Sequence, residues 1–405
     1  MKRKINNLTG ISTSNWKLKK FKFKEKTINI GTVFSGIGAL EHALKILKLK
    51  HNLIFAGDID HHVKKTYFNN YKIDETKWHS DITNFEAKKF QGKIDLLMGG
   101  SPCQSFSMVG KRKGLDDSRG SLIHHFIRIV NEAKPKVFIF ENVKGLLSHN
   151  NGETWEFIKS EFVKHGYSNI HPMVLNAKDY GIPQNRERVF IVGFKNKSKK
   201  ILVPKPIQLD ITMQTLLTDD IDNIDKKHYL KSKGIKFVTS SKNRLKRYTQ
   251  INGKIALCQK ANQQSNWHGD FIFERVEDHI DFDEFIFNVE DIEEKYFLSD
   301  KVKSYVLAGG TKKYKTGNKT DLKIARPLLQ TMHKMHRAGV DNYITYSKGR
   351  IRKLTPEECF RLMGFKSLNT DGVSDTQLYR QAGNSIVVDV IIAILKEMDI
   401  TAYGR

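Results

Sequence analysis

The sequence predicts an α/β fold in which a parallel sheet is covered by helices on both faces. The first observation is a series of short apolar runs that read as buried strands, at residues 28–34, 53–56, 94–98, 137–140 and 189–194. The second is the helical spacing of apolar residues between these runs, at Leu40, Ala43, Leu44 and Leu47 and again at Ile123, Phe126, Ile127 and Val130. Strands that alternate with helices in this way pair in parallel.

The first predicted strand ends in a glycine-containing loop, Phe34-Ser35-Gly36-Ile37-Gly38, that opens the first predicted helix. Its glycines allow the backbone to approach a ligand closely, and the helix N-terminus offers unpaired N–H groups. The loop lacks the third glycine of the dinucleotide fingerprint, and this argues against a bound pyrophosphate.

Acidic residues follow the second predicted strand and recur further along the chain. Asp58-Ile59-Asp60 provides carboxylates for both hydroxyls of a ribose, with an apolar neighbour that can lie against adenine. Asp81-Ile82 can serve the base in the same way. The alternative for each acid is a helix cap. Together with the loop at 34–38, these residues indicate a nucleoside-containing cofactor without a pyrophosphate, and S-adenosylmethionine fits that description.

The third predicted strand leads into Gly99-Gly100-Ser101-Pro102-Cys103, where the glycines let the backbone turn sharply. Cys103 is therefore expected at the carboxyl edge of the sheet, where backbone donors stabilise a thiolate and a substrate can reach it. The alternative is a small, buried apolar residue without chemistry. The surroundings favour a nucleophile.

Glu141 and Asn142 end the fourth predicted strand, and a charged segment at 184–188 precedes the fifth. Each has a structural alternative, an ordinary helix start for the first pair and a surface turn for the second. Ligands of open α/β sheets collect at the carboxyl ends of strands. The shared placement of Cys103 and Glu141 therefore favours catalysis.

The α/β pattern stops near Gly193 and returns near Leu354, where Thr355-Pro356-Glu357-Glu358 supplies a helix N-cap and early acidic residues. The intervening residues are irregular, with basic and acidic stretches, and this predicts a small, irregular domain inserted into the first. The expected division is a basic N-terminal extension at 1–27, a catalytic and cofactor-binding domain at 28–198 and 346–405, and the inserted domain at 199–345.

The chain of 405 residues carries a formal net charge of +25, which implies a strongly anionic partner. Nucleic acid is the first candidate and an anionic membrane surface the second. Cys103, Cys258 and Cys359 lie far apart in the sequence, which argues against a disulfide framework or a zinc site. We see no signal peptide and no run apolar enough to span a bilayer, so we expect a soluble, cytoplasmic protein.

Seven motifs stand in an order that resembles the DNA (cytosine-5) methyltransferase family of bacterial restriction-modification systems. They lie at 34–38, 102–104, 117–122, 141–143, 184–188, 352–357 and 381–385. Any one of them can arise by chance, but seven in register form a specific signal. The resemblance implies the Rossmann-like sheet of S-adenosylmethionine-dependent methyltransferases, with S-adenosylmethionine as cofactor, duplex DNA as substrate and the insert as a target-recognition domain.

The resemblance also implies roles for four catalytic residues. The thiolate of Cys103 adds to carbon 6 of cytosine and thereby activates carbon 5. Glu141 hydrogen-bonds N3 and the amino group of the base. Arg188 holds the base carbonyl, and Arg186 supports the Cys103 loop or the charge balance of the site. The residues expected to bind the cofactor are Phe34, Ser35, Gly36, Gly38, Asp58, Ile59, Asp81, Ile82, Pro102, Leu122, Asn384 and Ser385.

A cytosine inside a duplex cannot reach Cys103, so the base must be flipped out of the helix, and residues 110–119 resemble the loop that closes over it. The side chains expected to contact DNA are Gln104, Ser107, Lys111, Arg112, Arg119 and Gln184. We expect a monomer that acts on double-stranded DNA, with a cognate restriction endonuclease as a candidate partner. The alternatives are a relative that methylates cytosine in RNA, against which the long insert argues, and a non-enzymatic DNA-binding protein, which leaves the strand-end motifs unexplained.

Overall fold

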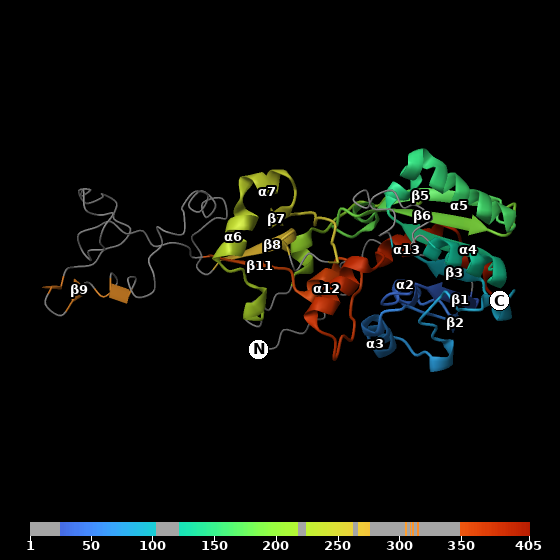
Figure 1. The fold of residues 1–405 in the computed structure, drawn as a ribbon, viewed down its shortest axis with the longest axis horizontal. Coiled ribbons are helices and arrows are strands. Elements are labelled where there is room, and N and C mark those ends of the chain that lie inside the picture. Colours follow the sequence, from blue (N-terminus) through green and yellow to red (C-terminus); the bar gives the residue numbers. More distant parts are fainter. Residues whose placement is uncertain are drawn as a thin grey trace. The chain divides into compact units, whose positions relative to one another are not determined.

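The structure is a computed structural model that describes residues 25–102, 121–217, 224–261, 266–275 and 349–405, with short pieces between 304 and 315 (Figure 1). It divides into two compact units. The first comprises Met1–Ile224, Asn252–Asp270 and Leu354–Arg405, and the second comprises Asp225–Ile251 and Phe271–Lys353.

The first unit is built on a six-stranded sheet with the strand order β2-β1-β3-β4-β6-β5. Its strands are β1 (Ile28–Val33), β2 (His51–Phe55), β3 (Leu96–Gly99), β4 (Val137–Asn142), β5 (Asn169–Asn176) and β6 (Glu187–Phe194). Strands β1 to β4 pair in parallel, whereas β6 pairs antiparallel with both β4 and β5. The carboxyl ends of β1 to β4 therefore meet at one edge of the sheet.

The predicted α/β fold is confirmed, but the prediction of a parallel sheet is wrong for the run at 189–194. A strand that the sequence analysis did not identify, β5, precedes β6 and pairs with it as a hairpin. A hairpin reverses the strand direction, whereas a parallel neighbour needs a crossover connection. Strand β5 lies at the edge of the sheet, and only Met173, Leu175 and Asn176 in it are buried, so it carries no continuous apolar run.

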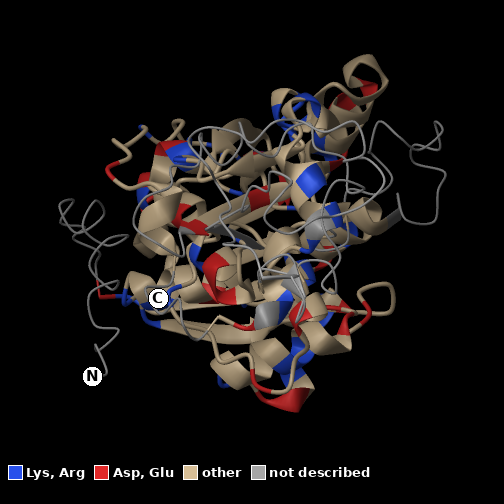
Figure 2. Ribbon diagram, turned by 90° about the vertical axis from the view of Figure 1, so that its left-hand side faces the viewer, with Lys and Arg blue, Asp and Glu red and all other residues tan. Residues whose placement is uncertain are grey.

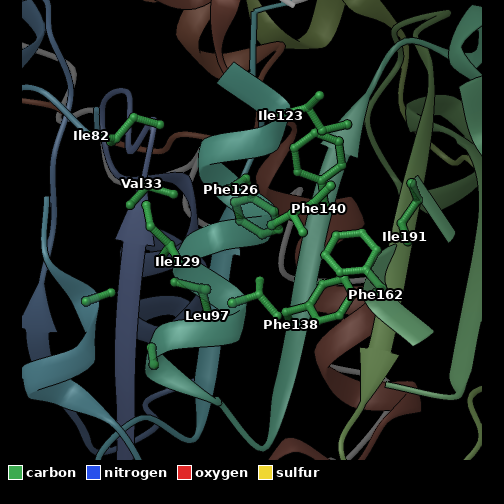
Figure 3. Packing of buried hydrophobic residues seen from close by; sticks show 14 of the residues in the cluster. Val33, Ile82, Leu97, Ile123, Phe126, Ile129, Phe138, Phe140, Phe162 and Ile191 are labelled. Carbon is green, nitrogen blue, oxygen red and sulfur yellow. The ribbon is translucent and has the colours of Figure 1, made fainter. Parts of the chain in front are cut away.

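Helices cover both faces of this sheet. The helices of the first unit are α2 (Ala39–Ile46), α3 (His61–Asn70), α4 (Ser121–Ala133), α5 (Glu153–Lys164), α11 (Pro356–Arg361), α12 (Asp375–Asn384) and α13 (Val388–Glu397). On one face, the rings of Phe126 from α4 and Phe162 from α5 have centroids 6.1 and 4.4 Å from that of Phe138 in β4 (Figure 3). Met98 and Ile139 point to the opposite face, because side chains alternate along a strand, and both are buried.

The segment Asp375–Glu397, which contains α12 and α13, is long and apolar enough to pass for a membrane-spanning helix by composition. This differs from the expectation that no run would be so apolar. However, 83% of its most apolar window is buried inside the protein, and every residue of α13 from Val388 to Leu395 is buried. The apolar character of α13 is therefore explained by its packing against α2 in the core.

The first unit also takes in residues 199–224 and 252–270, which the sequence analysis placed in the inserted domain. Main-chain hydrogen bonds hold these segments to it. Ile207 N donates to Asp179 O at 2.9 Å, and Ala256 N donates to Pro183 O at 2.7 Å. The chain thus leaves the first unit and re-enters it twice.

The second unit contains a three-stranded sheet with the order β11-β8-β7, which the description of the insert as irregular did not anticipate. Its helices are α6 (Ser232–Thr239) and α7 (Ser241–Leu245), and the strands of this sheet are β7 (Thr249–Ile251), β8 (Gly269–Arg275), whose first two residues belong to the first unit, and β11 (Gly349–Lys353). Two short strands, β9 (Gly310–Thr311) and β10 (Tyr314–Lys315), form a separate antiparallel pair. Figure 2 shows Lys and Arg interspersed with Asp and Glu along the described helices. The role of this unit in target recognition stays a prediction.

Candidate functional site

A cavity of about 350 Å³ opens where β1 to β4 end. Its wall is formed by segments that follow these four strands, by the last turns of α12, and by residues of α3, α4 and the start of β6. Eight residues predicted to bind a cofactor lie on this wall: Phe34, Asp58, Ile59, Asp81, Ile82, Pro102, Leu122 and Asn384. The structure thus brings together motifs from both ends of the chain at the carboxyl edge of the sheet.

The loop after β1 shapes one side of the cavity. Phe34 has a φ of 51°, in the left-handed region that a non-glycine residue adopts at a cost of about 1–3 kcal/mol. Gly36 has a φ of 55°, and a Cβ built on it would meet no described atom within 4 Å. The backbone N–H of Gly36 donates to Asp58 Oδ2 at 3.0 Å. The hydrogen bond to Asp58 therefore fixes the loop, while the space beside the Cα atom of Gly36 is open, so a ligand can approach the backbone closely there.

Gly38 serves the packing of α3 rather than the cavity, whose wall does not include it. It has a φ of 80°, and a Cβ built on it would collide with the ring of Tyr71. The hydroxyl of Tyr71 donates to Gly38 O at 2.9 Å. The absence of a side chain at this position lets the end of α3 lie directly against the loop.

Replacing Gly38 by Ala should lower the free energy of unfolding by about 2–4 kcal/mol, because the strained φ and the collision with Tyr71 add. Gly36→Ala is the matched control, since it has a similar φ but open space, and it should cost only about 1 kcal/mol. Urea unfolding followed by circular dichroism measures both values. Equal losses in the two variants would contradict the packing role of Gly38.

Asp58 and Asp60 have different tasks in the structure. Asp60 Oδ1 accepts a hydrogen bond from His62 N at 2.9 Å and caps α3. Asp58 accepts from Asp60 N through Oδ1 and from Gly36 N through Oδ2, both at 3.0 Å, and burial raises its pKa. The capping alternative that the sequence left open therefore applies to Asp60, while Asp58 lies beside the loop.

Ile59 and Asp81 offer two surfaces suited to a nucleoside. The side chain of Ile59 is 79% exposed although it is apolar, and it lies on the cavity wall. Asp81 Oδ1 accepts hydrogen bonds from Thr83 N at 2.9 Å and Thr83 Oγ1 at 2.8 Å, and these bonds lower the pKa of Asp81. The apolar side chain of Ile59 suits the face of an adenine ring, and the ionised carboxylate of Asp81 suits its amino group.

Glu141 lies at the end of β4 and is nearly buried. Arg188 Nε lies 3.2 Å from Glu141 Oε1. Burial raises the pKa of Glu141, and the charges of Arg188 and Arg186 oppose this effect without reversing it. A Cβ built on Gly100 would lie only 2.9 Å from Glu141 Oε2, so the glycine lets the backbone pass close to the carboxyl group. Such an arrangement holds the carboxyl group in one orientation at the edge of the cavity.

Asn142, for which the sequence predicts no role of its own, lies on the cavity wall next to Glu141. Its Nδ2 donates to Ser101 O and Ser101 Oγ, both at 3.3 Å, and its Oδ1 accepts from Val143 N at 2.8 Å. These bonds tie the end of β4 to the segment that leads to Cys103. The signal available in the sequence was its position next to Glu141 within the same motif.

Several predicted residues lie outside the residues that the structure describes. They are Cys103, Gln104, Ser107, Lys111, Arg112 and Arg119. Pro102, which directly precedes Cys103 in the sequence, lines the cavity. The roles assigned to these six undescribed residues stay predictions.

Arg186 is buried, lines the cavity and bonds to main-chain atoms of three residues. Its Nη2 donates to Gly383 O at 3.0 Å and to Ser385 O at 2.9 Å, and its Nη1 donates to Gln259 O at 3.0 Å. Its charge opposes the rise in the pKa of Glu141. Its predicted role in the charge balance of the site stays a prediction. Its main-chain contacts make it a positioning residue that fixes the turn carrying Asn384.

The expectation that Gln184 contacts DNA is wrong. Its side chain is fully buried, and its Nε2 donates to Leu362 O at 2.8 Å. Its Oε1 accepts from Gln259 N at 3.2 Å. Gln184 instead joins three segments of the first unit that are remote in sequence.

Comparisons with known proteins identify the family of the chain. The chain matches the family model of C-5 cytosine-specific DNA methylases over residues 28–399. It is 30% identical to the orphan methyltransferase M.SPRI of Bacillus phage SPR over 92% of this chain and 97% of that one. It is also 30% identical to the type II methyltransferase M.HhaI of Haemophilus parahaemolyticus, over 89% of this chain and 90% of that one.

The Dnmt2 methyltransferase of S. pombe shares the fold, with a TM-score of 0.62 at 16% identity over 91% of this chain and 97% of that one. The family match spans the sheet, the cavity wall and the helices that return after residue 354. The chain therefore belongs to the family of C-5 cytosine-specific DNA methylases.

Proposed function

We propose that the protein transfers a methyl group from S-adenosylmethionine to carbon 5 of a cytosine flipped out of a short, specific duplex DNA site, through a covalent adduct between Cys103 and carbon 6. The observation that carries the proposal is one cavity that joins Asp58 and Asp81 to the pair Glu141–Arg188. Pro102, the neighbour of the proposed nucleophile, lies on the same wall.

The residues of the cavity fit S-adenosylmethionine. Asp58 is placed to accept hydrogen bonds from the ribose, while Ile59 and Asp81 offer a platform and an acceptor to the adenine. The first turn of α2 has no side-chain cap, so its N–H groups suit a carboxylate. When bound, the cofactor supplies an electrophilic methyl group on its sulfonium.

Glu141 and Arg188 would hold the cytosine. The carboxylic acid of Glu141 donates a hydrogen bond to N3 of the base, and its second oxygen accepts one from the amino group. Arg188, oriented by its 3.2 Å contact with Glu141, supports the base carbonyl. Drawing electron density toward N3 makes carbon 6 a better target for a thiolate.

Cys103 would act as the nucleophile. Its thiolate forms a bond to carbon 6, and the electron pair of the C5–C6 double bond moves toward carbon 5, which becomes nucleophilic enough to accept the methyl group. Loss of the carbon 5 proton then restores the double bond and expels the thiolate. The enzyme leaves the cycle unchanged, and the cytosine carries one methyl group.

The substrate would be double-stranded DNA. The protein would bind it as a monomer, in the cytoplasm. The formal net charge of +25 favours a polyanion, and a base that reacts in this cavity must leave the helix. A cognate restriction endonuclease is the candidate partner, because relatives such as M.HhaI are named type II methyltransferases.

Incubation with S-adenosylmethionine labelled in its methyl group and duplex DNA tests this proposal. Label is expected on carbon 5 of cytosine, with no loss when transfer RNA is added in excess. Label on adenine, label on no base, or preferential labelling of the RNA would each contradict the proposal. Bisulfite sequencing of plasmid DNA from a host that expresses the chain then locates the site.

A further inference from the structure

The segment Asn252–Asp270 belongs to the first unit, but both of its ends continue into the second unit, at Ile251 and at Phe271. It therefore joins the inserted part of the chain to the part that forms the cavity. The proposed function assigns no role to this joining segment.

Gln184, which precedes β6, holds the joining segment near its middle. Its Oε1 accepts a hydrogen bond from Gln259 N at 3.2 Å, and its Nε2 donates to Leu362 O at 2.8 Å. A main-chain bond from Asn185 N to Ala256 O at 2.8 Å flanks this contact. Because these bonds engage the main chain of the joining segment, they fix its path rather than the orientation of one side chain.

The joining segment also lies against the wall of the cavity. Arg186, which lines the cavity, donates through Nη1 to Gln259 O at 3.0 Å. Gly383 lines the cavity as well, and a Cβ built on it would collide with Ala261 N. The main chain of the joining segment therefore passes directly beside two residues of the cavity wall.

Asp270 ties the far end of the joining segment to its middle. Leu257 N donates to its carboxylate, at 3.3 Å from Oδ1 and 3.0 Å from Oδ2. Asp270 is buried and is the second residue of β8, which continues into the second unit. The start of β8 is thereby joined, through residues 257–259, to Gln184.

We propose, on the basis of the proposed function, that Gln184 and Asp270 are positioning residues for the DNA substrate. They hold the joining segment in one path, so that a duplex bound by the second unit delivers its cytosine to the cavity. Neither side chain acts on the base itself, since Gln184 is fully buried and Asp270 is 6% exposed. Their effect passes through the main chain of residues 257–259 to the cavity wall.

A role in stability alone would have different kinetic consequences. Loss of a buried hydrogen bond that only supports the core lowers the fraction of folded protein, which reduces the apparent kcat and leaves KM for DNA unchanged. A loosened joining segment instead raises KM for DNA, because part of the binding free energy is then used to order it.

Steady-state methyl transfer to duplex DNA separates the two roles. Gln184→Met keeps the size of the side chain and removes both of its hydrogen bonds. It should raise KM for DNA about 10-fold or more, the scale of one or two lost hydrogen bonds, while kcat falls less than about 3-fold. Affinity for S-adenosylhomocysteine should change less than about 2-fold.

Two variants of Asp270 test the other end of the joining segment. Asp270→Ala should raise KM for DNA on the same scale as Gln184→Met. Asp270→Asn keeps one acceptor oxygen for Leu257 N and should retain most of the unaltered affinity. The two Asp270 variants carry the test by themselves if Gln184→Met fails to fold.

Tyr167→Phe is the matched control. It removes a buried hydrogen bond, from Tyr167 Oη to Pro135 O at 2.8 Å, in the core of the first unit, and Tyr167 does not line the cavity. KM for DNA should stay unchanged in this variant. Hydrogen exchange adds a readout independent of activity, because the main-chain amides of residues 255–259 should exchange faster in Gln184→Met and at the unaltered rate in Tyr167→Phe.

An unchanged KM for DNA in Gln184→Met and Asp270→Ala, or a fall in kcat alone, would overturn the positioning role and leave the proposed function intact. Absence of methyl transfer to DNA by the unaltered protein would overturn the proposed function together with this assignment.

Discussion

Replacing Cys103 by Ser is expected to reduce methyl transfer by about four orders of magnitude or more, the scale seen when a covalent nucleophile is removed. A serine hydroxyl is far harder to ionise than a thiol, so the addition to carbon 6 that activates carbon 5 no longer occurs. Binding of DNA and cofactor should persist, because both depend on other residues. Transfer of labelled methyl groups measures the first effect, and titration with fluorescent duplex DNA measures the second.

Cys359→Ala is the matched control for this experiment. Cys359 lies on α11, is fully buried and does not line the cavity, so its loss should affect stability slightly and transfer little. A duplex with 5-fluorocytosine at the target adds a direct readout, since the fluorine cannot leave as the proton does and the adduct accumulates. A covalent complex with the Cys103→Ser protein, or undiminished transfer by it, would contradict the assignment of the nucleophile.

The parts of the site that follow strands could be predicted from the sequence, because each is local. An apolar strand that leads into Phe34, Asp58 or Pro102, or that carries Glu141 near its end, places that residue at the carboxyl edge of the sheet. The parallel order of these strands then brings the residues to one cavity. Placing these residues at that edge requires no information about how side chains pack in the core.

The features that sequence did not reveal depend on contacts between remote segments. The sequence predicts a DNA contact for Gln184 and a supporting role in the site for Arg186, with a surface turn as the alternative. The structure buries both side chains against Leu362, Gln259 and the turn after α12. The partners of Gln184 and Arg186 lie far away in the sequence, and no local sequence pattern predicts these contacts.

The two carboxylates after β2 illustrate the same limit at short range. Whether Asp58 or Asp60 caps α3 depends on which side chain reaches His62 N, and both residue types are suitable caps. The direction of β6 likewise follows from β5, an edge strand whose partly exposed residues give only a weak apolar pattern. Residue type alone cannot supply this information.

Glu141→Gln is expected to lower the rate of methyl transfer by about 100- to 1,000-fold, within the range for loss of a positioned proton donor. The glutamine has the same size and can still face Arg188, but it presents no acidic proton to N3 of cytosine. Affinity for S-adenosylhomocysteine should change little. The glutamate Glu156 on α5 is exposed and does not line the cavity, so Glu156→Gln serves as the matched control.

The same variant tests the raised pKa of Glu141, because this pKa makes the free energy of unfolding depend on pH. Because burial raises the pKa of Glu141 above its ordinary value of 4.5, the folded protein binds the proton more tightly than the unfolded chain does. The stability contributed by the protonated group is therefore fully present below pH 4.5 and is lost as the pH rises through the higher folded value. Glu141→Gln, which cannot ionise, should gain stability relative to the unaltered protein as the pH rises from 5 to 8. Urea unfolding of both proteins across that range measures the difference. A difference that stays constant with pH, or a variant that transfers methyl groups at the unaltered rate, would show that Glu141 does not act as a buried proton donor.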